Sequence, residues 1–157
     1  MGLFQRNGAK LTPYLQLLKG IPLFSKLTNQ EFIILSQIIH ERTYLKGEVI
    51  FEECDEGLGM YVVVEGRVQI HRNADGGQVK LSEIEPGAFF GELALLSGAP
   101  RSATAICLEP TRLLFFFRPE FMDVLETHGK MGSKLSIQIA IHTAERLRRV
   151  VLDRDFL

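Results

Sequence analysis

The stretch FGELALLSGAPRSAT, residues 90–104, decides the fold and the function that this chain is expected to have. It places a carboxylate, Glu92, and a guanidinium, Arg101, at the two ends of a short helix and loop. Gly91 permits a close backbone approach, and the strong helix formers that follow it allow the first helical amides to face an anion. This layout suits a small ligand that carries both a hydroxyl group and a phosphate.

The two charged side chains have different expected partners. Arg101 is the only cation between Lys80 and Arg112, and its planar donors match the paired oxygens of a phosphate. Glu92 would repel a phosphate, so its expected partner is a neutral donor such as a ribose 2′-hydroxyl. Each residue taken alone also has a structural explanation, Glu92 as a first-turn carboxylate favoured by the helix dipole and Arg101 as a solvated loop cation.

The same stretch closely resembles the phosphate-binding cassette of cyclic nucleotide-binding domains, the modules of cyclic-nucleotide-gated channels, kinase regulatory subunits and catabolite activator proteins. The resemblance covers residues 21–152, and it implies that the ligand is a cyclic nucleotide. In this family a hydroxyl at the position of Ser102 occurs in binders of cyclic AMP and of cyclic GMP, so Ser102 does not decide between them. The implied ligand-binding residues are Gly91, Glu92, Leu93, Ala94, Arg101, Ser102 and Ala103.

The resemblance continues on both sides of the cassette. The spacing of Thr28 and Glu31 is a capping box that starts the family's entry helix. Residues 60–70 are similar to the family's paired strands around a glycine turn. Two departures precede them, because Cys54 stands where the family usually has a turn glycine and Leu58 where an aspartate is common.

The expected fold is α+β, an antiparallel β-roll flanked by N-terminal helices and a C-terminal helical lid, with a short cassette helix. Between residues 44 and 117, short β-branched and aromatic runs alternate with turn signals such as Asp75-Gly76-Gly77. We expect residues 1–20 to form an N-terminal helical extension. Residues 21–157 are expected to form the cyclic nucleotide-binding domain, including its C-terminal helices.

A short helix and a long helix are expected after the strands. Pro119 begins the short helix, and His128-Gly129 is expected to close it with a glycine cap. The long helix, residues 133–153, carries an apolar stripe of Ile137, Ala140, Ile141, Ala144, Leu147 and Val151.

Packing of this apolar stripe on the chain's own β-roll is the simpler interpretation for part of it. The resemblance implies two further uses of the long helix, as a lid over the purine and as the seam of a homodimer. Arg146, Arg149 and Val150 are candidate lid residues, although the sequence alone does not align them with the base.

Composition argues for one domain that does not read DNA. A length of 157 residues and an apolar fraction of 46% fit a single domain with its own core. A single domain of this length leaves no room for the helix-turn-helix of transcriptional relatives. A formal charge of −1 also gives no basic surface that would indicate binding of nucleic acid. Arginines gather near the end of the chain, but interleaved acidic residues make a solvated helix face the simpler interpretation.

Catalysis, metal binding and membrane insertion are not expected. The four histidines are isolated, so no metal site is expected, and no catalytic constellation follows from the spacing. No apolar run is long enough for a secretory signal or a membrane span. The two cysteines, Cys54 and Cys107, are consistent with free thiols, so the expected location is the cytoplasm. We expect a binding protein without a cofactor, and not an enzyme.

The leading hypothesis is a stand-alone sensor of a cyclic nucleotide, with cyclic AMP preferred over cyclic GMP. Movement of the C-terminal helix would then pass the signal to a protein effector in trans. The alternative is a degenerate domain that keeps the fold and acts as an interaction or dimerisation module through its long helix and residues 11–18. A β-roll enzyme is a third class, disfavoured because the chain shows no catalytic set.

Overall fold

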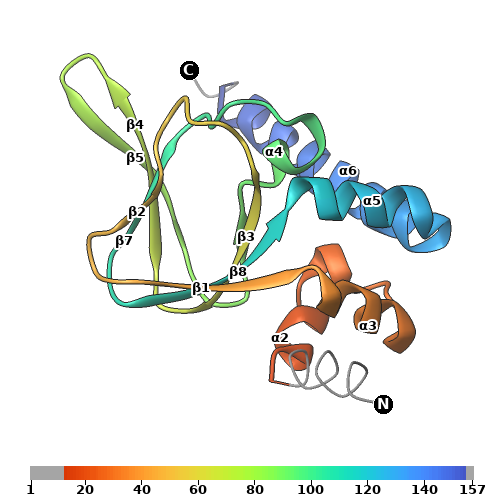
Figure 1. The fold of residues 1–157 in the computed structure, drawn as a ribbon. Helices are drawn as coiled ribbons and strands as arrows, with labels where there is room; N and C mark the ends of the chain where they lie inside the picture. The colour runs from red at the N-terminus through yellow and green to blue at the C-terminus, as the bar shows by residue number, and fades with distance from the viewer. Residues whose placement is uncertain (1–12, 155–157) are drawn as a thin grey trace.

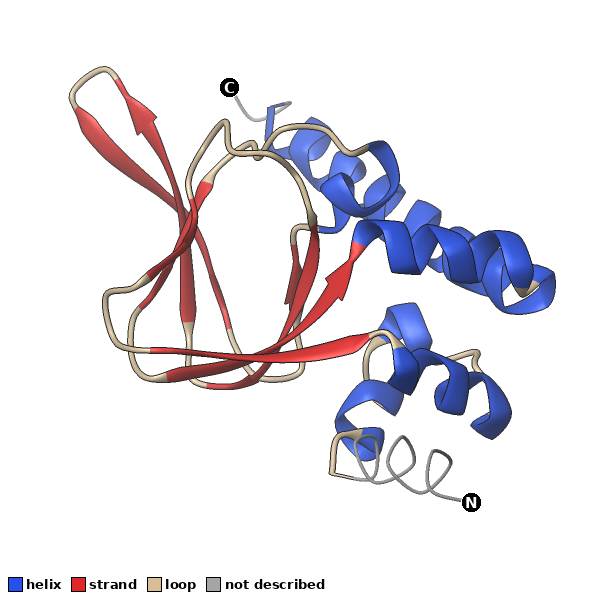
Figure 2. Cartoon of the chain, viewed as in Figure 1, coloured by secondary structure: helices blue, strands red, loops and turns tan. Residues whose placement is uncertain are grey.

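Two antiparallel sheets form the body of the protein, and the helices gather at one end of it (Figures 1 and 2). The structure is a computed structural model that describes residues 13–154. One sheet has the order β1–β8–β3–β6, with the bounds Ile39–Tyr44, Thr111–Phe117, Gly59–Glu65 and Phe89–Phe90. The other has the order β2–β7–β4–β5, with the bounds Val49–Phe51, Thr104–Cys107, Val68–Ala74 and Gly77–Ile84.

The helices fall into three groups along the chain. Those before the sheets are α2 (Leu15–Lys19), the 3₁₀ helix η1 (Pro22–Phe24) and α3 (Asn29–Gln37). The short helix α4 (Glu92–Ser97) interrupts the strands, and α5 (Arg118–Thr127) and α6 (Gly129–Arg154) follow them. The expected α+β class, antiparallel roll and flanking helices are therefore confirmed.

The turns of two hairpins lie at the residues where the sequence predicts them. β3 and β4 meet around Gly66, whose φ of 91° lies in the left-handed region that favours glycine. β4 and β5 meet at Asp75-Gly76, and their pairing extends to Ala74 opposite Gly77. Polar residues at the strand ends of this second hairpin also pair through the backbone, and the hairpin projects beyond the roll (Figure 1).

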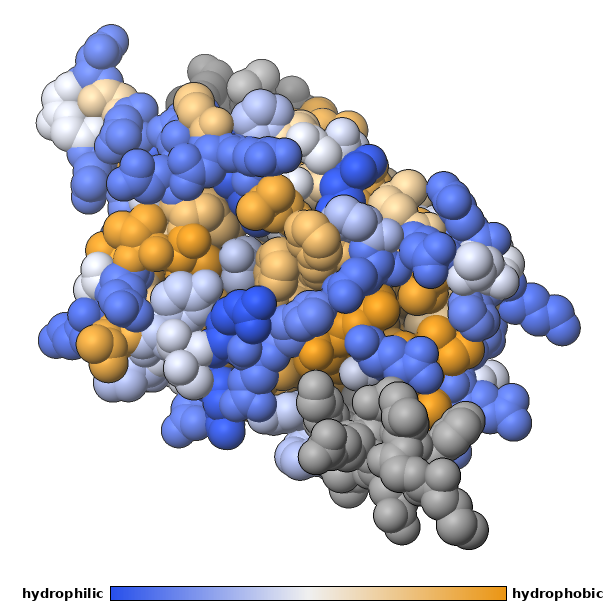
Figure 3. All heavy atoms as spheres, viewed as in Figure 1, coloured by the Kyte–Doolittle hydropathy of each residue, from blue (hydrophilic) through white to orange (hydrophobic). Residues whose placement is uncertain are grey.

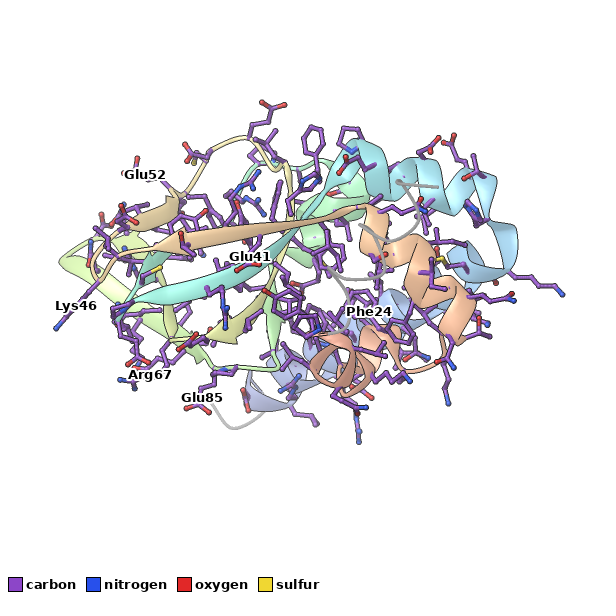
Figure 4. The ribbon with its side chains drawn as sticks, turned by 60° about the horizontal axis from the view of Figure 1, so that its bottom comes forward. Phe24, Glu41, Lys46, Glu52, Arg67 and Glu85 are labelled. Carbon is purple, nitrogen blue, oxygen red and sulfur yellow. The ribbon has the colours of Figure 1, made fainter. Side chains whose placement is uncertain are left out.

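The larger core cluster lies between the helices and the sheet that contains β8. Phe24 and Phe116 meet there with ring centroids 5.5 Å apart, and Figure 4 shows Phe24 enclosed between helix and strand. Leu18 and Ile21 belong to the same cluster. Leu18 is therefore core and not part of an adhesive surface, whereas Leu11 lies outside the described residues. The proposed boundary at residue 20 stays a prediction.

A second, smaller core fills the inside of the roll. Its buried members include Tyr61, Val63, Phe90 and Leu113, and Tyr61 stacks on Phe90 with centroids 5.3 Å apart. This aromatic floor lies directly beneath the cassette. Charged residues such as Lys46 and Arg67 lie at the opposite end of the roll, as Figure 4 shows.

The predicted capping box begins α3 and also joins it to α6. The Thr28 amide donates to Glu31 Oε2 at 2.7 Å, and the Glu31 amide donates to Thr28 Oγ1 at 3.2 Å. Lys134 on α6 donates to both carboxylate oxygens of Glu31, at 3.0 and 2.8 Å. Burial alone would raise the pKa of Glu31, but the hydrogen bonds from Lys134 and Thr28 outweigh it and lower that pKa.

The junction of α5 and α6 corrects two predictions. α6 begins at Gly129 and not at residue 133, and Gly129 starts this helix instead of closing α5 with a glycine cap. Gly132 lies against α5 so closely that a Cβ atom there would sit 2.6 Å from the carbonyl oxygen of Leu125. This contact fixes the rotation of α6 about its axis.

The rotation of α6 turns the predicted apolar stripe away from the roll. Met131, Leu135 and Ile139 are the buried apolar residues of this helix. By contrast, Ile137 is 54% exposed and Leu147 is 62% exposed. The expectation that part of the apolar stripe packs on the roll is therefore wrong, and the stripe lies open.

None of the helices within residues 13–154 has the length and apolar character that a membrane crossing requires.

The Glu31–Lys134 ion pair gives a pH-dependent prediction. Glu31→Gln keeps the capping box, since glutamine also serves at this position, and removes only the charge. A carboxylate whose pKa is lowered in the fold stabilises it above the unfolded-state pKa, and this contribution disappears as the pH falls through the folded-state value. We expect the variant to be less stable by about 1 kcal/mol at pH 7, with the difference shrinking as the pH falls below the ordinary value of 4.5.

Urea unfolding at several pH values measures this difference. Glu126→Gln is the control, because Glu126 is exposed and forms no ion pair with the described residues. A stability gap for Glu31→Gln that did not change with pH would contradict the assignment.

Candidate ligand-binding site

A cavity of about 580 Å³ opens between the roll, α4 and α6, and this volume lies within the roughly 300–1,000 Å³ of small-molecule sites. On the face shown in Figure 3, hydrophobic residues gather in the middle, between roll and helices, and hydrophilic residues surround them. The cavity is lined by every residue predicted to bind ligand, namely Gly91, Glu92, Leu93, Ala94, Arg101, Ser102 and Ala103. The structure therefore brings these residues together, and their contacts with a ligand stay a prediction.

Arg101 is buried but has no carboxylate partner among the described residues. Its side chain lies over the ring of Phe51, with Cζ 4.0 Å from the ring centroid, and the residue is 6% exposed. Nη1 approaches the Gly91 carbonyl oxygen at 3.5 Å, and Nε is buried with no hydrogen-bond partner in the described part of the chain. Burial lowers the pKa of Arg101, since removing a cation from water disfavours its charged form.

The loop of residues 52–58 holds the backbone on which Arg101 sits. The Arg101 amide donates to the Asp55 carbonyl at 2.8 Å, and the Cys54 amide donates to the Arg101 carbonyl at 2.8 Å. Cys54 has a φ of 73°, a left-handed conformation that explains why glycine suits this position better. Gly57 is buried beneath the cassette, where a Cβ atom would overlap the Ala99 carbonyl oxygen and lie 2.5 Å from Ala94 Cβ.

α4 begins at a glycine in the predicted place. Gly91 is its N-cap with a φ of 79°, and no side chain within residues 13–154 caps the helix start. The first amides of α4 are thus left to another acceptor. At the other end of the helix, Arg118 Nη2 donates to the Leu96 carbonyl at 2.9 Å, which ties α4 to the start of α5.

Glu92 has partners that the sequence did not predict. The carboxylate is 4% exposed, and Arg146 Nη1 donates to its Oε1 at 3.0 Å. His142 Nε2 lies 3.7 Å from the same oxygen, and its ring packs on Phe89 with centroids 4.6 Å apart. The expected hydroxyl acceptor is thus already held by α6.

One face of α6 completes the cavity, and we call it the cavity face. Its members are His142, Arg146, Arg149, Val150 and Asp153. They continue the row of buried residues that ends at Ile139. The candidate lid residues Arg146, Arg149 and Val150 all lie on this face, whereas His142 and Asp153 were missed, although their helical spacing from Arg146 and Arg149 could have found them.

The roll supplies the opposite wall, which the sequence did not reveal. Phe51, Ile70 and Phe90 come from three separate strands, and Leu81 and Ser82 come from the projecting hairpin. Within residues 13–154 no group of three or more histidine, cysteine or acidic side chains is placed to hold a metal ion. The arrangement offers a buried cation, free amides and a carboxylate around a partly apolar cavity.

Comparison with known proteins gives a consistent result. The family model described as "Cyclic nucleotide-binding domain" matches residues 41–128. The cyclic AMP receptor protein of Thermus thermophilus is 34% identical over 89% of this chain and 63% of its own length. A cAMP-dependent protein kinase regulatory subunit of Mycosarcoma maydis is 32% identical over 65% of this chain and 19% of its own length. The chain therefore spans only part of these relatives.

A solved structure is also similar to this chain. The N-terminal domain of a transcriptional regulator from Streptomyces coelicolor superposes with a TM-score of 0.75 at 30% identity. The match covers 90% of this chain and 95% of that one.

Gly57 gives a test of how the cassette is supported. In Gly57→Ala the added methyl group must displace the backbone at Ala99, so we expect a destabilisation of about 1–3 kcal/mol. Gly129→Ala is the control, because a Cβ atom there has open space. Urea unfolding measures both variants, and equal stabilities would contradict the close packing of the loop under the cassette.

Proposed function

The chain belongs to the cyclic nucleotide-binding domain family, and on this premise we propose that it senses cyclic AMP. The nucleotide occupies the cavity between the roll, α4 and the cavity face of α6. Its phosphate pairs with Arg101 and the first amides of α4, and its ribose 2′-hydroxyl donates to Glu92. The protein binds its ligand without transforming it, and it needs no cofactor.

The observation that carries this proposal is the buried guanidinium of Arg101. A buried cation is unfavourable unless an anion or a hydrogen-bonding partner compensates for it. Among the described residues Arg101 receives a cation–π contact and one long hydrogen bond, and Nε has no acceptor. A phosphate offers the paired acceptor oxygens that a planar guanidinium binds best.

Cyclic AMP is preferred over cyclic GMP in this proposal. The two relatives above are a cyclic AMP receptor protein and the regulatory subunit of a cAMP-dependent protein kinase. Ser102 does not distinguish the two nucleotides. Competition between them in a binding experiment decides the preference.

The signal passes through α6 to a protein effector in trans. Ligand shifts a population between open and closed positions of this helix, because it contacts the cavity face only in the closed form. A shift from 1:99 to 99:1 needs a preference of about 5.5 kcal/mol for the closed form. The expected location of this sensor is the cytoplasm, and we expect neither direct binding of nucleic acid nor a membrane span.

A homodimer through α6 is the second part of the proposal, and the exposed apolar stripe favours it. Ile137, Ala140, Ala144, Leu147 and Val151 follow the alternating spacing of three and four residues that defines a coiled-coil seam. The same residues are exposed. The stripe also serves the alternative hypothesis, a domain that has lost its ligand and acts only in dimerisation.

Calorimetric titration of nucleotide-free protein tests the ligand. We expect micromolar or tighter binding of cyclic AMP by the wild type. Arg101→Met should weaken it by roughly 30-fold to several-thousand-fold, since truncating one partner of a buried charge pair loses about 2–5 kcal/mol. The free energy of unfolding without ligand should stay the same or rise, because the variant buries no cation.

Lys46→Met is the control for charge, since Lys46 lies at the far end of the roll (Figure 4). Folded wild-type protein that took up neither nucleotide would support the alternative hypothesis instead.

Sedimentation equilibrium tests the dimer. We expect self-association of the wild type and its loss in Leu147→Glu, which places a charge in the proposed seam. Val79→Glu changes an equally apolar and 48% exposed residue on the hairpin, so it should associate like the wild type. A monomeric wild type at high concentration would contradict the dimer.

A further inference from the structure

The carboxylate of Glu92 is buried, and the described basic side chains beside it come from one helix. Glu92 begins α4, whereas Arg146 and His142 lie one turn apart on α6. Both approach Oε1 of Glu92, at 3.0 and 3.7 Å. The first residue of α4 is therefore tied to the C-terminal half of α6.

The geometry leaves room for a second partner on the same carboxylate. An ionised carboxylate has about four acceptor positions on its two oxygens. Within the described part of the chain, Arg146 is the hydrogen-bond donor to Oε1, and Oε2 has none. A hydroxyl group can therefore donate to Oε2 while Arg146 holds Oε1.

The charges make Arg146 necessary for such an arrangement. Glu92 lies in the same cavity as the guanidinium of Arg101 and the anion that Arg101 is expected to bind. An unpaired buried carboxylate would oppose that anion, and it would also be costly to keep out of water. Arg146 is 55% exposed at its side chain, so it reaches the buried Glu92 from solvent without being buried itself.

We propose that Arg146 positions Glu92 and neutralises its charge, so that the carboxylate accepts a hydrogen bond from the sugar hydroxyl of the nucleotide. This inference rests on the proposed function and adds a residue to it. Arg146 acts on the sugar through Glu92, as a positioning residue for that carboxylate. Recognition of a ribose is thereby coupled to the position of α6, because the same carboxylate serves both.

The sharpest test compares cyclic AMP with its 2′-deoxy analogue, which lacks only the hydroxyl group. We expect the wild type to prefer cyclic AMP by about ten- to a hundredfold, the range for a hydrogen bond to a charged group. In Arg146→Gln this ratio should fall to about threefold or less, because Glu92 loses its fixed position. Arg146→Lys should recover part of the ratio, since it restores the charge without the fork of donors.

A double-mutant cycle separates positioning from direct contact. Glu92→Gln alone should abolish most of the preference for the ribose, and adding Arg146→Gln should change it no further. Arg148→Gln is the matched control, because Arg148 is exposed on the same helix and does not line the cavity. A ratio that stayed at the wild-type value in Arg146→Gln, with both ligands weakened equally, would overturn the proposal.

Hydrogen exchange without ligand tests whether the Glu92–Arg146 pair holds α6, and it does so independently of whether the protein binds cyclic AMP. We expect residues 142–154 to exchange faster in Arg146→Gln and in Glu92→Gln, and no faster still in the double variant. Unchanged exchange in both variants would show that the pair does not hold α6 and would overturn the inference even if cyclic AMP binds. If the wild type bound neither nucleotide, the proposed function and the recognition of the sugar by Glu92 would both be wrong. Faster exchange of residues 142–154 in the variants would then show that Arg146 stabilises the fold and has no role in ligand binding.

Discussion

A buried guanidinium without a carboxylate is the constraint around which the site is organised. Arg101 is removed from water, and the described residues compensate it only with the Phe51 ring and a long hydrogen bond. The surrounding chain maintains this position through the left-handed Cys54, the buried Gly57 and the backbone bonds to Asp55. Strain and desolvation of this kind lower the stability of the fold, and they persist where the surrounding structure prepares a site for a ligand.

The long helix α6 serves three purposes on different parts of its surface. Its first turns pack on the core, its last turns present the cavity face, and the apolar stripe is open to solvent. The contact of Gly132 with Leu125 fixes the rotation of the helix and so determines which residues belong to each surface. A change in that rotation would alter the cavity face and the apolar stripe together, so ligand binding and association through the stripe would be energetically linked.

Local signals made much of the fold and the cassette predictable. The capping box at Thr28, the hairpin glycines and the glycine before α4 each act within a few residues, where sequence patterns are informative. Contacts between distant segments left no such signal, as the pairing of Glu92 with Arg146 shows. The setting of α6 was predicted only in part, because part of its most regular apolar stripe was expected to pack on the roll, whereas Met131, Leu135 and Ile139 are the buried apolar residues and Gly132 packs closely on α5.

The aromatic floor of the cavity also gives the protein an optical property. The chain has three tyrosines and no tryptophan, so tyrosine emission is not masked. Tyr61 lies against Phe90, and the Arg101 guanidinium is 5.8 Å from its ring. The Tyr61 phenol is neutral at physiological pH, and burial raises its pKa further above the ordinary value of 10.0. An anion that binds Arg101 changes the electric field at this fluorophore. Ligand binding can therefore be followed by the tyrosine emission of the unlabelled protein.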